Sequence, residues 1–222
     1  MKKYYIPILF STALIMGGCG EMEAKDNTNA QEEQKSSDTL ALQDEFTKKF
    51  IHSSEEVEKG YYQFTSATNG YKILFPINAT IDDVFYEKNN EGYEAIYFGE
   101  EREEDNIGYS VKSTYENEKS TEWVDSYLQL LIGSSNLQPE DFKQYTLDDK
   151  LIYFAEEEFK INDKANGTAY IFLSFIKSKT TNQAVSVEYT ASCTNETLEC
   201  NFDVEEERQK AKKLIHSVSF IK

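Results

Sequence analysis

The feature that most constrains the fold of this chain is a series of short segments in which apolar, often aromatic, residues alternate with polar ones. Alternation with a period of two is typical of half-buried β-strands. Asn69-Gly70 favours a tight turn between the first two segments, and Pro76 ends the second because proline has no backbone N–H to donate. We expect strands over residues 61–65, 71–75, 81–87, 93–99, 107–115, 151–159, 168–177 and 184–192.

Two helical patterns lie among these strands. Ser120 opens the first, which ends at Gly133 and has a predicted apolar face formed by Trp123, Tyr127, Leu130 and Leu131. Asp203 opens the second, in which glutamates fill the first turn and lysines come later, an order that suits the helix dipole. We expect one more strand, over residues 218–221, after this helix.

The order of these elements predicts the fold class. Several strands, a helix, three strands, a helix and one strand indicate an α+β fold, a largely antiparallel sheet with helices packed on it. Tyr62-Gln-Phe-Thr-Ser66 with Gly70-Tyr-Lys-Ile-Leu-Phe-Pro76, and the closing segment 211–220, resemble the two ends of PsbP/Mog1-like domains. The resemblance implies a PsbP/Mog1-like sandwich but no particular function, because members of that family do unrelated jobs.

The N-terminus carries a pattern of another kind. Two lysines precede an uncharged, mostly apolar run from Tyr4 to Met16, which is shorter than the ~20 residues needed to cross a bilayer core. A charge, a short apolar run and then small residues are typical of an export signal. Met16-Gly17-Gly18-Cys19 resembles the lipobox of bacterial lipoproteins. That resemblance implies cleavage after Gly18 and attachment of a diacylglyceryl group to Cys19.

These patterns divide the chain into three parts. Residues 1–18 are the lipoprotein signal peptide, residues 19–45 a flexible acidic tether that includes the start of a leading helix, and residues 46–222 a single α+β domain. Residues 20–38 lack aromatic and β-branched aliphatic side chains, so they cannot bury enough apolar area to offset the entropy of ordering. The leading helix is expected over residues 39–52, where Leu42, Phe46 and Phe50 repeat at a spacing of four.

Two cysteines remain once Cys19 is assigned to the lipid. Cys193 and Cys200 form an even pair in an exported chain, which predicts a disulfide, with free thiols as the alternative. Closing this short loop would stabilise the domain by roughly 2–3 kcal/mol. A zinc site is not expected, because such a site needs four ligands and neither histidine lies nearby in the sequence.

The formal net charge is −17, from 40 acidic and 23 basic side chains, which argues against nucleic-acid binding. The acidic run Glu100–Asp105 lacks the spacing of a calcium loop, so we expect a solvated hairpin tip. His216, near the end of the last helix, is expected to be partly exposed, and no known hydrolase motif accompanies it. We expect neither a metal site nor a cofactor.

Together these features predict a lipoprotein that is anchored by its lipid to the extracytoplasmic face of the cell membrane. Its domain is expected to be a non-catalytic binding or envelope-assembly module, with an unidentified envelope protein as a further partner. Two alternatives remain open. One is a carboxylate-dependent cell-envelope hydrolase that uses a pair such as Glu157 and Glu188, with their carboxyl groups ~5–10 Å apart. The other is a carrier of a small ligand or cation.

Overall fold

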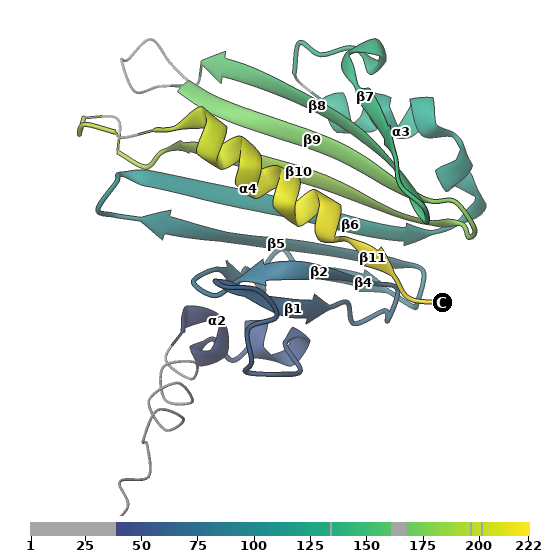
Figure 1. Cartoon of the computed structure of the whole chain (residues 1–222), viewed down its shortest axis with the longest axis horizontal. Helices are drawn as coiled ribbons and strands as arrows, with labels where there is room; N and C mark the ends of the chain where they lie inside the picture. Colours follow the sequence, from purple (N-terminus) through teal and green to yellow (C-terminus); the bar gives the residue numbers. More distant parts are fainter. Residues whose placement is uncertain (1–38, 134, 161–167, 196, 201) are drawn as a thin grey trace, which may run out of the picture.

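The computed structural model describes residues 39–133, 135–160, 168–195, 197–200 and 202–222 (Figure 1). The predicted signal peptide, Cys19 and residues 20–38 of the tether lie outside these residues, so they stay predictions. Within the described ranges, no helix has both the length and the apolar character needed to cross a membrane.

The larger of two sheets has eight strands, and every pairing in it is antiparallel. Its strand order is β3-β5-β6-β10-β9-β8-β7, and β4 pairs with β5 beside β3. The strands are β3 (Thr80–Ile81), β4 (Glu87–Asn89), β5 (Tyr93–Arg102), β6 (Ile107–Asn117), β7 (Lys143–Thr146), β8 (Lys150–Lys160), β9 (Thr168–Ser178) and β10 (Gln183–Cys193).

The smaller sheet joins the two ends of the domain. The predicted hairpin of β1 (Tyr61–Thr65) and β2 (Tyr71–Pro76) is present, and β11 (Ser219–Phe220) pairs with the other edge of β2. This sheet and helix α4 (Val204–Ser217) lie over the same face of the large sheet (Figure 1). Between them is the main core, in which Phe64 and Phe75 of the small sheet meet inward-facing side chains such as Phe98.

The opposite face of the large sheet is covered in part. Helix α3 (Val124–Ile132) and a 3₁₀ turn, η3 (Pro139–Asp141), lie over β8 and β9. Along β9 the alternation of side chains separates the two cores, because Phe172 and Ile176 face α4 whereas Leu173 and Phe175 face α3. The largely antiparallel sheet is thus confirmed. The structure is more sheet-dominated than the predicted α+β sandwich, since two open sheets supply most of its elements.

The predicted leading helix over residues 39–52 is wrong. The structure has one turn of α-helix, α2 (Leu40–Gln43), and a separate 3₁₀ turn, η1 (Thr47–Phe50). Asp44 lies between them and its side chain accepts a hydrogen bond from the backbone N–H of Thr47 at 2.7 Å, so it caps the second turn in place of continuing the first. Ala41 is completely buried, so the packed body extends to the N-terminal side of residue 46.

The predicted apolar face of the helix after Ser120 is also wrong in part. Residues 119–122 form a 3₁₀ turn, η2 (Lys119–Glu122), and α3 begins only at Val124. Trp123 thus precedes α3 and is 68% exposed. Within the helix Leu130 is 75% exposed, because the buried face runs through Tyr127 and Leu128, which pack on Phe175 and its neighbours. The predicted end at Gly133 is confirmed, with its φ at +52°.

Candidate functional site

A pocket of about 270 Å³ opens between the small sheet, α4 and the adjoining ends of β5 and β6. We call it the Arg102 pocket. Its polar lining comes from side chains that are far apart in the sequence: Tyr61, Asn78, Glu100, Arg102, Tyr109, Tyr189 and Lys210. Of the depressions in the described surface, this one gathers a connected set of ion pairs and hydrogen bonds around a buried carboxylate, Glu207.

Strand β5 places two of the charged groups. Ile96 and Phe98 face the core, and the same alternation carries Glu100 and Arg102 to the same face further along the strand. The prediction that Glu100–Asp105 is a solvated hairpin tip therefore holds only for its second half. The turn is confined to residues 103–106, and Glu100 and Arg102 are half-buried members of β5.

Glu207 lies in the first turn of α4 and is only 1% exposed. Its Oε1 accepts a hydrogen bond from Nη2 of Arg102 at 2.6 Å and another from Nζ of Lys210 at 3.0 Å. Its Oε2 accepts a hydrogen bond from the hydroxyl of Tyr189. Both oxygens of this buried carboxylate therefore have strong hydrogen-bond donors, two of them cations.

These contacts determine which groups carry charge. Burial alone raises the pKa of Glu207, but the hydrogen bonds from Tyr189, Arg102 and Lys210 outweigh burial and leave the pKa below its usual value. Burial raises the pKa of Tyr189, and the negative charge of Glu207 raises it further. Burial likewise raises the pKa of Tyr109 well above its usual value, with Glu100 adding to the effect. At neutral pH the pocket therefore holds a carboxylate anion and two protonated phenols.

The guanidinium of Arg102 has donors to spare. Nη2 binds Glu207, and Nη1 lies 3.7 Å from the more exposed Glu206, but the buried Nε has no hydrogen-bond partner among the described residues. Across the pocket, Glu100 accepts a hydrogen bond from the hydroxyl of Tyr109 at 3.2 Å and a longer one from the amide of Asn78 at 3.5 Å. Opposite charges thus stand on neighbouring parts of one wall.

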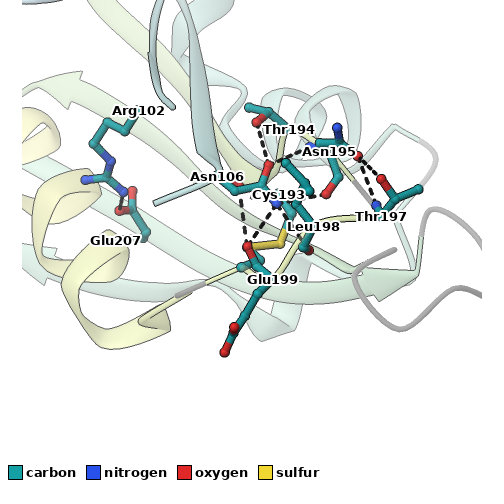
Figure 2. Close-up of a disulfide and its surroundings, with 10 residues drawn as sticks. Arg102, Asn106, Cys193, Thr194, Asn195, Thr197, Leu198, Glu199 and Glu207 are labelled. Carbon is teal, nitrogen blue, oxygen red and sulfur yellow. Dashed lines mark hydrogen bonds and ion pairs between the residues drawn. A yellow bond between two sulfur atoms is a disulfide. The ribbon is translucent and has the colours of Figure 1, made fainter. Parts of the chain in front are cut away.

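The turn that follows Arg102 is held by the disulfide loop (Figure 2). Cys193 and Cys200 are joined, as their pairing predicted, with their Cα atoms 6.0 Å apart. Asn106, whose φ is +56°, lies 5% exposed inside the loop. Its amide accepts from the Thr194 hydroxyl and the Asn195 N–H, and donates to the carbonyls of Asn195, Leu198 and Glu199. The β5–β6 turn is thereby fixed to the segment that leads into α4.

Comparison with known proteins gives the chain a family. Residues 37–219 match the family described as "Putative lipoprotein YvcA". The chain belongs to that family. It is also 28% identical, over 236 aligned positions, to the protein of the same description from Bacillus subtilis (strain 168), an alignment that covers 100% of this chain and 98% of that protein. The predicted resemblance to bacterial lipoproteins with a Mog1-like domain is confirmed.

The matched range, residues 37–219, includes all the residues of the Arg102 pocket and both disulfide cysteines. The family's description speaks of a lipoprotein and of nothing that the domain binds. The pocket was not predicted from the sequence. The available signal was the unbroken two-residue alternation from Ile96 to Arg102, which the acidic composition of the following residues concealed.

The structure separates the two carboxylates of the hydrolase alternative. Glu157 on β8 and Glu188 on β10 point to the same face of the large sheet, with β9 between their strands. Neither is buried. Glu157 is engaged by the backbone and side-chain amides of Asn136, and Glu188 lies in a different depression beside Leu130. They do not form the deep cleft with two buried carboxylates that would favour glycan hydrolysis.

Other candidate residues lie away from the Arg102 pocket. His216 is exposed near the end of α4, where its ring lies 6.4 Å from that of Tyr145. Its backbone carbonyl accepts a hydrogen bond from Nζ of Lys150 at 2.8 Å, which satisfies an otherwise open acceptor at the helix end. Within the described residues, no three His, Cys, Asp or Glu side chains converge as metal ligands would.

Proposed function

We propose that this chain is a lipoprotein held at the extracytoplasmic face of the cell membrane by a lipid on Cys19, and that its domain is a non-catalytic binding module. The family supports the lipoprotein, and the Met16–Cys19 sequence supports the attachment point. Two acyl chains on one residue suffice for stable anchoring, whereas one chain is marginal. The Arg102 pocket is the proposed binding site.

The observation that carries the binding role is the protonation of the pocket. A general acid or base works best with a pKa near the working pH. Hydrogen bonds from Tyr189, Arg102 and Lys210 hold the pKa of Glu207 low, and burial raises the pKa values of Tyr109 and Tyr189. All three pKa values therefore lie farther from pH 7 than the usual values of these groups. Groups of this kind hold the wall of the pocket in place through hydrogen bonds to one another and do not exchange protons with a ligand.

The pocket favours a small ligand over a large protein surface. Its volume of about 270 Å³ lies just below the range of roughly 300–1,000 Å³ usual for drug-sized ligands. A carrier of a small molecule is therefore the form of binding module that the geometry supports best. Tethered by residues 20–38, such a domain would sample its ligand close to the membrane surface.

The anchor is tested with Cys19→Ser in the full chain. We expect this variant to lose incorporation of labelled fatty acid and to leave the membrane fraction. Cys200→Ser is the matched control, because it makes the same chemical change at a cysteine outside the signal and should keep both properties. Equal labelling of the Cys19→Ser variant and the parent chain would contradict the proposed attachment.

The binding site is tested by photo-crosslinking in the native membrane. A crosslinking side chain at Asn78, on the exposed rim of the pocket, should capture a ligand, and Arg102→Gln should abolish that capture. The control position is Val84, which is 80% exposed and is not among the lining residues. Capture at both positions alike, or a turnover activity removed by Glu157→Gln or Glu188→Gln, would contradict the proposed binding module.

A further inference from the structure

We propose that the Arg102 pocket binds a small zwitterion of the size of a free amino acid, with its carboxylate at Arg102 and Lys210 and its ammonium group at Glu100. This inference rests on the proposed function and adds the chemical class of the ligand. It follows from three properties of the pocket: two partly exposed cations at one end, a single carboxylate at the other, and aromatic and aliphatic walls between them.

The positive end carries two cations, and one of the two carboxylates that pair with them is exposed. Arg102 and Lys210 are both paired with the buried Glu207. Glu206 also pairs with both, 2.6 Å from Nζ of Lys210 and 3.7 Å from Nη1 of Arg102, but it is 59% exposed, and exposed ion pairs are worth little, so a ligand carboxylate can replace it. The side chains of Arg102 and Lys210 are 21% and 26% exposed, which leaves them open to a ligand.

The geometry of Arg102 suits a carboxylate. Guanidinium groups are strong donors to carboxylates, and Arg102 uses Nη2 for Glu207 while Nη1 has only the exposed Glu206, at 3.7 Å, beside it among the described residues. Glu207 holds the guanidinium in place from behind, and the disulfide loop fixes the turn that follows it. The donors are therefore oriented before a ligand arrives, which lowers the cost of binding.

The negative end is Glu100, two residues before Arg102 on the same face of β5. The hydroxyl of Tyr109 and the amide of Asn78 donate to it, and both donors are neutral, so its charge is not cancelled. Two residues along a strand span about 6.6 Å. This spacing lets the two ends of one small zwitterion face Glu100 and Arg102 together.

The walls and the volume limit the size of the ligand. The rings of Tyr109 and Tyr189 stack at 5.1 Å between centroids, and Tyr61, Ile77 and Leu214 complete the lining. The pocket's volume of about 270 Å³ lies below the range of roughly 300–1,000 Å³ usual for drug-sized ligands, which suits a ligand of the size of an amino acid.

The test is titration calorimetry on the full chain, purified in detergent. Each of the twenty common amino acids is titrated singly, and the best binder is repeated as its N-acetyl derivative and as its C-terminal amide. The first derivative lacks the ammonium charge and the second lacks the carboxylate. We expect at least one amino acid to bind, and each blocked derivative to bind about tenfold more weakly or worse, because each loses a charged hydrogen-bonding group.

Two pocket variants and one matched control complete the test. Glu100→Gln and Arg102→Gln should each weaken binding of the amino acid about tenfold or more. Glu101→Gln makes the same change one residue along β5, on the opposite face of the strand, and should bind as the parent chain does. Glu100→Gln does not touch Glu207, so it remains informative if Arg102→Gln fails to fold.

Three results would overturn the inference: no binding of any amino acid at millimolar concentration, full binding of both blocked derivatives, or equal affinity of the Glu100→Gln and Glu101→Gln variants. The proposed function fails separately. If photo-crosslinking at Asn78 captures a ligand that is not a zwitterion, the binding module stands and the ligand class is wrong. If nothing is captured at Asn78 and no amino acid binds, both are wrong.

Discussion

Two buried glutamates at opposite ends of β5 are stabilised in different ways. Glu94, near the start of the strand, is 0% exposed, and Glu207 of α4, which meets the end of the strand at Arg102, is 1% exposed. Among the residues that the structure describes, the donors to Glu94 are all neutral: the N–H groups of Ala67 and Thr68 and the hydroxyls of Thr68 and Tyr86. Glu207 accepts from two cations and a phenol.

The directions of the two pKa shifts differ accordingly. Burial raises the pKa of Glu94, and its neutral hydrogen bonds do not offset the effect. Burial also acts to raise the pKa of Glu207, but there the hydrogen bonds of Tyr189, Arg102 and Lys210 reverse the shift. Four neutral donors orient a carboxylate without making its charge favourable, whereas nearby cations stabilise the charge itself.

The largest expected effect comes from removing the charge of Glu207. Glu207→Gln leaves Arg102 and Lys210 without their shared buried partner, and we expect a loss of about 3 kcal/mol in the free energy of unfolding at neutral pH. Urea denaturation of the full chain in detergent measures this loss in the free energy of unfolding. Glu206→Gln is the matched control, because that side chain is 59% exposed and should change stability little. Equal effects of the two variants would contradict the buried-pair interpretation.

The disulfide sharpens the comparison, because it supports only the Arg102 end of β5. Replacing both Cys193 and Cys200 with serine should lower the free energy of unfolding by about 2.5 kcal/mol, since an eight-residue loop is no longer closed in the unfolded chain. Loss of the disulfide should also accelerate backbone hydrogen exchange more at Asn106 and Arg102 than at Glu94. Uniform acceleration along β5 would show that the loop does not support this end selectively.

A smaller effect is expected at the other end of the strand. Glu94→Gln keeps one acceptor oxygen, which serves the N–H of Ala67 or that of Thr68 because these donate to different oxygens, and it removes an unfavourable buried charge. We therefore expect a loss of about 1 kcal/mol or less, clearly below that of Glu207→Gln. The measurement is the same urea denaturation at neutral pH. A loss as large as that of Glu207→Gln would mean that neutral donors stabilise a buried carboxylate as well as cations do.

The smallest effects, a few tenths of a kcal/mol to about 1 kcal/mol, distinguish the two glutamates by sign. Because the folded pKa of Glu207 lies below 4.5, its stabilisation is present above pH 4.5 and is lost as the pH falls through the folded pKa. Because the folded pKa of Glu94 lies above 4.5, the cost of its charge is relieved as the pH falls towards 4.5.

Denaturation of the parent chain and both variants at about pH 7 and about pH 4 measures these signs. The advantage of the parent chain over Glu207→Gln should shrink on acidification. Its stability relative to Glu94→Gln should rise over the same interval. Parallel changes for the two variants would contradict the opposite pKa shifts.

Local signals in the sequence predicted much of the fold. Asn69-Gly70 and Pro76 bound the first hairpin as expected, and Asp203 caps α4 by accepting from the N–H groups of Glu205 and Glu206. These signals act over a few residues, so sequence reasoning can evaluate them. The break at Asp44 is also local, but its competing hydrogen bond to Thr47 was hidden by the regular spacing of Leu42, Phe46 and Phe50.

The Arg102 pocket depends on contacts that no local pattern reveals. Arg102 and Glu207 are 105 positions apart and meet only because the β5–β6 turn is attached to the segment before α4. The sequence marked Cys193 and Cys200 as a pair but gave no sign that Asn106 fills their loop. Strand β7 was missed for another reason: all four of its residues are exposed, so it has no alternation to detect.

The small sheet imposes an order of events on folding. Its hairpin, β1 and β2, joins strands that are close together in the sequence, whereas β11 pairs with Lys72 and Tyr71 from the far end of the domain. The backbone N–H of Ile221 also donates to the carbonyl of Gly70, and the side-chain amide of Gln183 donates to the carbonyls of Gly70 and Ile221. The edge of the hairpin therefore stays open, and prone to wrong partners, until these distant residues reach it.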